Sequence, residues 1–595
     1  MAVNSFREDE KITTDSKNVI LRLFSYMKKY TAPVIGVLIC MLITVAICLV
    51  NPLIIEEALD GPIANKDLNG LIKLGIFAVV LDSLYFFMVK VRIYVMSKVS
   101  NHILMDIRQE LYEHIQTLSF SFFDSRPTGK ILARIIGDVN GLKEVLTNAV
   151  TTMIPEAITV IGVLVIMLIK DWRLALASLC TLPVMTVAIW VVRKFAHSKW
   201  MDHRQKASNL NAFVHEDIAG ISVVQSFSAE KETQSTFIDV NHGNRDSFIE
   251  ACRLSDSILP IANISWGIGS MVMYLVGVKY LGFPEVSLGL LTAFGAYIGM
   301  FWNPIVNISN FYNQVVTNLS SCERIFEILD TDPDIFDEPG VSDLPEIKGS
   351  VEFKNVSFTY DEGTENETKV LEDVSFLVKP GETIALVGPT GAGKTTIVNL
   401  ISRFYDIQSG NILVDGYDLK KISINSLRRQ MGVMTQDNFI FQGTVRENIL
   451  YGKLDATEEE MIAAAKAVNA HDFIMKMPKG YDTELQELGQ GLSVGQRQLI
   501  AFARTMISSP RILILDEATS SIDTHTEILV QQGISALLSG RTSFVIAHRL
   551  STIQNADRIF VIDDGGIKEC GTPAELMAMK GAYYKLYMAQ FEDVI

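Results

Sequence analysis

Hydrophobic residues are distributed very unevenly along this chain of 595 residues. In the first 330 residues they gather into six long runs, each of roughly the 20 residues that a helix needs to cross a lipid bilayer. The runs cover residues 33–53, 71–91, 145–169, 174–192, 258–281 and 288–308. The pattern therefore predicts six membrane-spanning helices.

Two long polar connections separate these runs, and both contain a helical period. Leu104, Ile107, Leu111 and Ile115 recur every three to four residues, which is typical of an amphipathic helix. We expect the connections to extend the membrane helices into water. The distribution of Lys and Arg predicts on which side of the membrane each connection lies. Eight of these residues lie in 90–143 and eight in 193–255, whereas the other three connections contain two, two and none. Both long connections and both termini are thus predicted to be cytoplasmic.

The pattern changes after residue 330. Residues 331–350 are rich in Asp, Pro and Gly and indicate a linker. From residue 351 onward, short apolar strands alternate with helical segments, which is typical of an α/β domain. The predicted fold is therefore an all-α transmembrane domain of six helices (1–330), a linker (331–350) and an α/β domain (351–595).

The net charge also differs between the two parts of the chain, residues 1–330 and 331–595. Residues 1–330 contain 28 basic and 30 acidic residues, whereas 331–595 contain 24 and 38, for a net charge of −16 overall. This balance argues against a nucleic-acid partner, since such proteins neutralise phosphates with basic side chains. The six cysteines show no CxxC spacing, so the sequence predicts neither a disulfide framework nor a zinc site.

A complete GxxxxGK[ST] motif follows the apolar strand at 383–387 and opens a helix. It consists of Gly388, Pro389, Thr390, Gly391, Ala392, Gly393, Lys394 and Thr395, and Thr396 comes next. Glycines let successive backbone N–H groups turn toward phosphate oxygens, and the start of the helix adds positive potential. Lys394 is expected to bridge the outer phosphates, and the Thr395 hydroxyl to hold Mg²⁺. The motif therefore predicts that residues 351–595 form an α/β P-loop nucleotide-binding domain that takes ATP with Mg²⁺.

A second apolar strand, at 512–515, ends in Asp516 and Glu517. An acidic pair at the end of a strand is often merely solvated. Beside a P-loop it favours hydrolysis, with Asp516 orienting Mg²⁺ and Glu517 accepting a proton from the attacking water.

Further motifs give the chain a specific resemblance. Leu492, Ser493, Val494, Gly495 and Gln496 are similar to the LSGGQ signature of ATP-binding cassette (ABC) proteins. In family order, other residues resemble the aromatic A-loop, the Q-loop, the D-loop and the switch histidine, namely Tyr360, Gln436, Asp523 and His548. The first 330 residues resemble the membrane part of the exporters of this family, including residues 123–129 of the first cytoplasmic connection.

The resemblance implies roles for these residues. Catalysis is assigned to Glu517, His548, Gln436 and Lys394. ATP binding is assigned to Tyr360, to the P-loop through Thr396, and to Ser493, Gly495, Gln496 and Asp523. Magnesium is assigned to Thr395, Gln436 and Asp516. Short coupling helices in the two cytoplasmic connections are expected to dock on the nucleotide-binding domain.

The family sandwiches ATP between the P-loop of one domain and the signature of another, and this chain has one of each. The resemblance therefore implies a half-transporter that needs a second such chain. Val494 stands where glycine is usual, and Glu517 is intact, as in the catalytically competent subunit of Gram-positive heterodimeric multidrug exporters. The expected function is ATP-driven export of amphipathic molecules across a bacterial cell membrane. The alternatives are a homodimeric lipid flippase or peptide exporter, and an ATP-gated channel.

Two acidic residues lie within apolar runs. Asp82 is in the middle of the second run, and Glu156 follows Pro155 in the third. A charge inside a membrane is costly and usually functional, so either residue is a candidate for contact with a cationic ligand in a water-filled cavity. The alternative is a structural hydrogen bond between helices.

Overall fold

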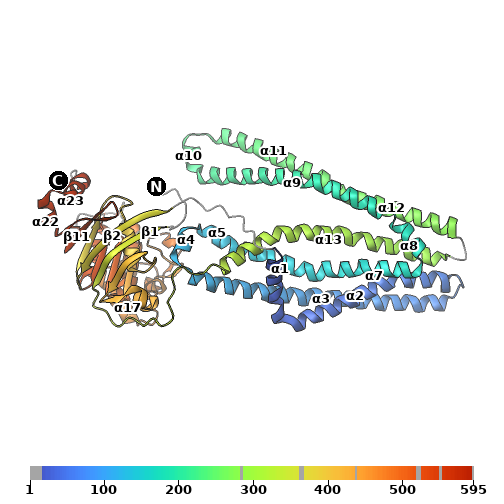
Figure 1. Cartoon of the computed structure of the whole chain (residues 1–595), viewed down its shortest axis with the longest axis horizontal. Coiled ribbons are helices and arrows are strands. Elements are labelled where there is room, and N and C mark those ends of the chain that lie inside the picture. Colours follow the sequence, from blue (N-terminus) through green and yellow to red (C-terminus); the bar gives the residue numbers. More distant parts are fainter. Residues whose placement is uncertain are drawn as a thin grey trace. The chain divides into compact units, whose positions relative to one another are not determined.

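The computed structural model describes residues 16–281, 286–360, 367–435, 438–516, 524–547 and 553–591 (Figure 1). The chain divides into two compact units. One, here called the helical unit, contains Arg7–Gln116 and Thr128–Thr331. The other, the sheet unit, contains Thr117–Pro127 and Asp332–Ile595. A short piece of the first long connection thus belongs to the sheet unit.

The helical unit is built from long helices. The main ones are α1 (Ser16–Ser25), α2 (Thr31–Ala58), α3 (Leu68–Thr117), α6 (Val139–Asn148), α7 (Ile154–Lys170), α8 (Trp172–Leu179), α9 (Leu182–Ala219), α11 (Glu230–Ser255), α12 (Ile258–Leu275) and α13 (Leu288–Leu329). Between α9 and α11 lies the short helix α10 (Ile221–Ser226), at the turn of a hairpin in which α9 and α11 run side by side (Figure 1). The helical extension of both long connections is confirmed.

Five helical stretches of the described chain are long and apolar enough to cross a membrane. They are Leu21–Ile63, Leu68–Thr117, Thr128–Lys170, Trp172–Ala219 and Glu230–Lys279. The sixth predicted run falls in α13, whose described apolar part is Leu288–Met300. The sixth crossing therefore stays a prediction. Many large apolar side chains on these helices are exposed, as expected where lipid is the solvent.

The interior of the helical unit is apolar. Val163 and Met167 of α7 pack with Phe294 and Tyr297 of α13 in one buried cluster. The Tyr297 hydroxyl donates a hydrogen bond of 2.7 Å to the Leu49 carbonyl of α2, which satisfies the polar end of this ring within the bundle.

The sheet unit contains two larger sheets. A four-stranded antiparallel sheet has the order β2-β1-β4-β5, with β1 at Val351–Tyr360, β2 at Thr368–Val378, β4 at Ser409–Val414 and β5 at Tyr417–Asp418. A six-stranded sheet has the order β12-β11-β3-β10-β9-β6. Its strands are β3 (Thr383–Val387), β6 (Met431–Met434), β9 (Ile512–Asp516), β10 (Thr542–Ile546), β11 (Arg558–Asp563) and β12 (Gly566–Gly571). All neighbours in it are parallel except β11 and β12.

The parallel strands are apolar throughout because both faces of the six-stranded sheet are covered. In β9, Leu513 and Leu515 pack into one buried cluster, and Ile512 and Ile514 pack into the other. The same alternation occurs in β3. Parallel strands place their carboxyl ends at one edge of the sheet, which is where ligands bind in open α/β sheets.

Candidate nucleotide site

The P-loop joins β3 to helix α14 (Lys394–Ile401). Its backbone enters the left-handed region at Gly388 (φ 151°), Gly391 (φ 86°) and Gly393 (φ 105°). A Cβ on Gly388 would lie 2.1 Å from the Ile562 carbonyl oxygen, so this strand end tolerates no side chain. The predicted strand–loop–helix context is thus present, and three glycines provide the backbone turns that a phosphate cradle requires.

The Lys394 ammonium lies inside this loop. Its Nζ donates hydrogen bonds of 2.8 Å to the carbonyl oxygens of Gly388 and Pro389. Burial lowers the pKa of Lys394, and the nearby Asp516 carboxylate partly offsets that effect. The loop therefore holds a half-buried cation against its own carbonyls, where an incoming phosphate offers a stronger partner.

The surroundings of the P-loop suit a magnesium-bound triphosphate. Asp516 ends β9 and pairs in register with Ile546 of β10, which in turn pairs with Leu386 of β3. That register brings Asp516 to the same sheet edge as the P-loop. Thr395 is exposed in the first turn of α14, so its hydroxyl and the Asp516 carboxylate form an oxygen donor set of the kind Mg²⁺ prefers.

Tyr360 contacts the first turn of α14. Its hydroxyl is 3.2 Å from Thr396 Oγ1, and its ring meets Tyr405 edge-on at 5.1 Å between centroids. Burial raises the pKa of the Tyr360 phenol, with a smaller opposing effect from Thr396. The structure therefore places the predicted adenine-stacking residue beside the P-loop helix.

The signature residues form the start of α19 (Val494–Ile507). Ser493 is the N-cap: its Oγ accepts a hydrogen bond from the Gln496 amide at 3.2 Å, and its own N–H donates to Gln496 Oε1 at 3.0 Å. Val494 is 39% exposed and Gly495 is buried. No hydrogen bond among the described residues joins Ser493 or Gln496 to the P-loop, as expected if the signature serves another chain's nucleotide.

Four predicted site residues lie outside the described residues: Gln436, Glu517, Asp523 and His548. Their roles stay predictions. Of the remaining candidates, the structure brings together the P-loop, Asp516, Thr396 and Tyr360.

An aromatic contact that no sequence motif predicts lies next to this site. Helix α4 (Phe120–Asp124) belongs to the sheet unit, and Phe120 stacks on Phe404 with ring centroids 5.3 Å apart. The Tyr405 hydroxyl donates a hydrogen bond to Asp124. The sequence did offer one hint: two adjacent aromatic residues, Phe404 and Tyr405, follow the P-loop helix, and Phe120 lies in the first long connection. Nothing in the sequence paired them. The docking expected for the first coupling helix is thus observed.

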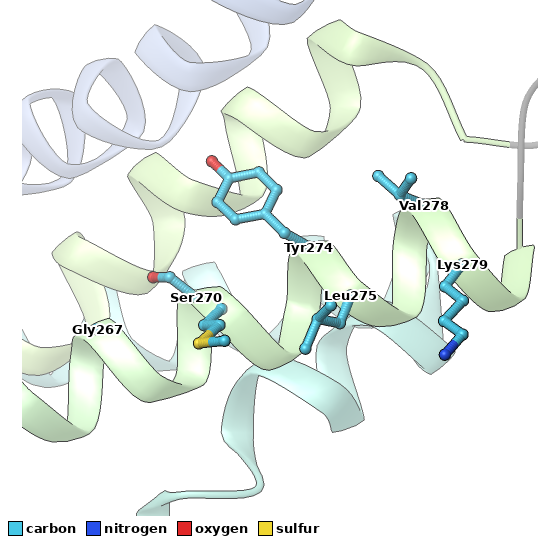
Figure 2. A pocket seen from close by; sticks show the side chains of 7 residues that line it. Gly267, Ser270, Tyr274, Leu275, Val278 and Lys279 are labelled. Carbon is cyan, nitrogen blue, oxygen red and sulfur yellow. The ribbon is translucent and has the colours of Figure 1, made fainter.

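A groove of about 570 Å³ lies along one face of α12 and the turn after it (Figure 2). Its lining is mostly apolar, with Ser270, Tyr274 and Lys279 as the polar contributors. Such a lining suits apolar groups rather than a triphosphate. The P-loop edge of the six-stranded sheet therefore stays the candidate nucleotide site.

Comparison with known proteins identifies the family of the chain. The family described as "ABC transporter transmembrane region" matches residues 34–305, and "ABC transporter" matches residues 371–520. An uncharacterized ABC transporter ATP-binding protein of Bacillus subtilis, YknV, is 41% identical over 96% of this chain and 95% of its own length. This chain belongs to the ABC transporter family.

Two further relatives refine the comparison. An ATP-dependent lipid A-core flippase of Syntrophus aciditrophicus is 36% identical over 97% of this chain and 95% of its own length. The structure of a bacterial Atm1-family ABC exporter with ATP bound superposes with a TM-score of 0.78 at 28% identity, covering 94% of this chain and 98% of that one. This ABC transporter is accordingly an ATP-hydrolysing, multi-pass membrane protein of exporter type.

Proposed function

We propose that the chain is one half of a dimeric exporter that couples ATP hydrolysis to the movement of amphipathic molecules across the cell membrane. One observation carries the proposal: a single chain joins the membrane region to one P-loop and one signature. A closed nucleotide site in this family needs both motifs from different domains, so a second chain must supply the complement.

Exposed apolar surface supports a partner. Helix α10 has no buried residue, and Phe227, which follows it, is 81% exposed. On the sheet unit, Phe439, Phe441 and Tyr451 form an exposed aromatic cluster with ring centroids 5.0 and 4.7 Å apart. Exposed apolar patches of this kind mark interaction sites. We propose that each such surface is covered by the second half-transporter.

Val494 supports a heterodimer. It is the first residue of α19, at the position that the signature offers to the nucleotide of the partner, and it carries a branched side chain where glycine is usual. We propose that this chain keeps the competent catalytic glutamate, Glu517, and that a different partner chain carries the better signature. Gln436, His548 and Asp523 complete the site in this proposal, with ATP and Mg²⁺ as the bound species.

The names of relatives support the substrate class. A Staphylococcus aureus ATP-binding/permease protein, 36% identical over 96% of this chain, has a name that suggests multidrug export. The Syntrophus relative is named as a lipid A-core flippase. Lipids and many drugs share an apolar body with a polar end, so the proposed substrate is an amphipath. A lipid flippase is the second candidate, supported by that relative.

Reconstitution in vesicles tests the function. Purified transporter in inside-out orientation should accumulate a fluorescent amphipath or flip a labelled lipid only when ATP and Mg²⁺ are supplied. ATP consumption with neither movement would overturn the proposal. Ion current gated by ATP binding, with no turnover, would instead support an ATP-gated channel.

Purification tests the partner. A tagged copy of this chain, expressed with and without a neighbouring homologous gene, should be isolated as an active ATPase only together with the second chain. A stable homodimer with full ATPase activity would refute the heterodimer and leave the export function standing.

A further inference from the structure

Three carboxylates lie along the seam between α13 and the α6–α7 segment of the helical unit. Asp138 is neutralised by Arg324, with Oδ1 and Nη2 2.6 Å apart. Glu144 and Glu156 take hydrogen bonds of 2.7 Å from the amides of Gln314 and Asn307. Among the described residues, neither of these two glutamates forms an ion pair.

Glu156 is the deeper of the two in the predicted span. Its Oε1 accepts the Asn307 amide, whereas its Oε2 is buried and accepts no hydrogen bond from any described residue. A buried polar atom without a partner is costly, and more so for a carboxylate inside a membrane. A purely structural link between helices would not require this charge, because a glutamine could also accept the Asn307 hydrogen bond.

Both helices are irregular at this level. The π-helical turn Ala149–Met153 comes directly before α7, and Pro155 lies in the first turn of α7. Pro304 lies inside α13, one turn before Asn307. Pro304 has no N–H, so inside α13 it cannot donate the helical hydrogen bond to the backbone carbonyl of the preceding turn. Carbonyl oxygens freed in this way coordinate cations in the broken helices of transporters, and π turns often lie at functional sites.

The surroundings favour an organic cation over a metal ion. Apart from Glu156, Thr159 and the terminal Lys170, helix α7 carries only apolar side chains and one glycine, and the Thr159 hydroxyl already donates to the Pro155 carbonyl. A small metal ion would lose its hydration there in exchange for few ligands. An amphipathic organic cation brings apolar surface that fits this lining and needs only one counter-charge.

We infer that Glu156, held in place by Asn307, is the counter-charge that selects positively charged amphipaths for export. Asn307 is exposed, so a ligand reaches the pair from the α13 side. The inference rests on the proposed export function and adds the charge of the substrate to it.

Two ions of matched size and opposite charge test the selection. Tetraphenylphosphonium and tetraphenylborate differ in charge but share their shape. The purified full-length transporter, in lipid nanodiscs without ATP, should bind tetraphenylphosphonium more tightly than tetraphenylborate. Glu156→Gln should weaken binding of tetraphenylphosphonium by about tenfold or more and leave or strengthen binding of tetraphenylborate, because only the charge is removed. Glu156→Asp should retain part of the preference.

Asp82→Asn is the matched control. Asp82, the other acidic residue in an apolar run, also accepts a hydrogen bond from an asparagine, Asn51, at 3.1 Å. Unlike Glu156, it is exposed and has no buried oxygen without a partner, so the structure does not favour it as the counter-charge. Asp82→Asn should leave the preference intact. Equal weakening of both ions by Glu156→Gln, unchanged binding of the cation, or the same loss in Asp82→Asn would overturn the inference. Because the measurement needs no ATP turnover, a transporter that binds cations but moves nothing in vesicles would refute the export function alone.

Discussion

The ring of Tyr360 meets the ring of Tyr405 edge-on, with centroids 5.1 Å apart and planes at 86°. The Tyr405 hydroxyl also donates a hydrogen bond to Asp124 of α4, and the ring centroids of Tyr405 and Phe120 are 6.4 Å apart. The residue predicted to stack on adenine is therefore two contacts away from the first coupling helix, and all of these groups belong to one compact unit.

The base-stacking role of Tyr360 is tested by truncation. Tyr360→Ala should weaken ATP binding by roughly 1–2 kcal/mol, or about 5- to 30-fold, as is typical of aromatic contacts. Tyr360→Phe keeps the ring and loses only the contacts of the hydroxyl with Thr396 and Asn399, so it should bind ATP nearly as the parent does. An ATP titration by intrinsic fluorescence measures both; equal affinities for the alanine variant and the parent would contradict the stacking role.

Docking of α4 should carry the effect of substrate to the ATPase. Phe120→Ala removes the ring that stacks on Phe404 and leaves every P-loop residue unchanged. We expect basal ATP hydrolysis to persist while stimulation by transported solute is largely lost. Phe120→Tyr preserves the stack and serves as the control. Stimulation that survives in Phe120→Ala would show that this contact does not transmit the signal.

Burial of Lys394 predicts how ATP affinity depends on pH. The pKa of Lys394 is lowered in the free protein, and triphosphate should raise it again because the anion favours the ammonium. Between those two pKa values, ATP binding takes up a proton. Affinity should therefore fall as pH rises through the alkaline range, by up to about tenfold per pH unit. Lys394→Arg stays protonated, so any ATP it binds should show a flat profile in the same calorimetric titration.

The assignment of Glu517 as the general base predicts a separation of binding from hydrolysis. Glu517→Gln should retain ATP affinity, while phosphate release slows by about two to four orders of magnitude, the usual contribution of such a base. Asp472, a carboxylate in the first turn of α18 (His471–Met475) and outside every nucleotide-site motif, supplies a control as Asp472→Asn. Unchanged turnover in Glu517→Gln would remove this residue from the mechanism.

Replacing Val494 in the signature with glycine should increase the rate of ATP hydrolysis. Val494→Gly restores the usual residue at the start of α19 and costs roughly 0.5–1 kcal/mol of helix stability at most. If Val494 crowds the second nucleotide site, ATP turnover of the assembled transporter should rise severalfold. A rate equal to that of the parent would mean that the side chain does not obstruct the partner's nucleotide.

Local chemistry explains why the P-loop was predictable. A loop that needs positive φ appears in the sequence as closely spaced glycines, and a strand buried on both faces appears as a continuous apolar run. Gly388 to Thr395 and the strand before Asp516 were therefore predicted from the sequence. The helical period at Leu104 and Ile107 likewise predicted the extension of α3. A turn that needs glycine and a helix or strand with an apolar period each leave a local pattern in the sequence, and these features were predicted from that pattern.

Contacts between distant segments were not predictable in the same way. Phe120 and Phe404 are 284 positions apart, and Glu156 and Asn307 are 151 apart. Aromatic rings and amides occur throughout such a chain, and which two of them meet depends on how whole helices pack. By itself the sequence determined the membrane runs, the phosphate loop and the need for a partner. Only the tertiary structure decided that α4 packs on Phe404 and Tyr405, next to Tyr360, and that Glu156 keeps a buried oxygen without a described donor, because packing selects among many chemically equivalent pairs.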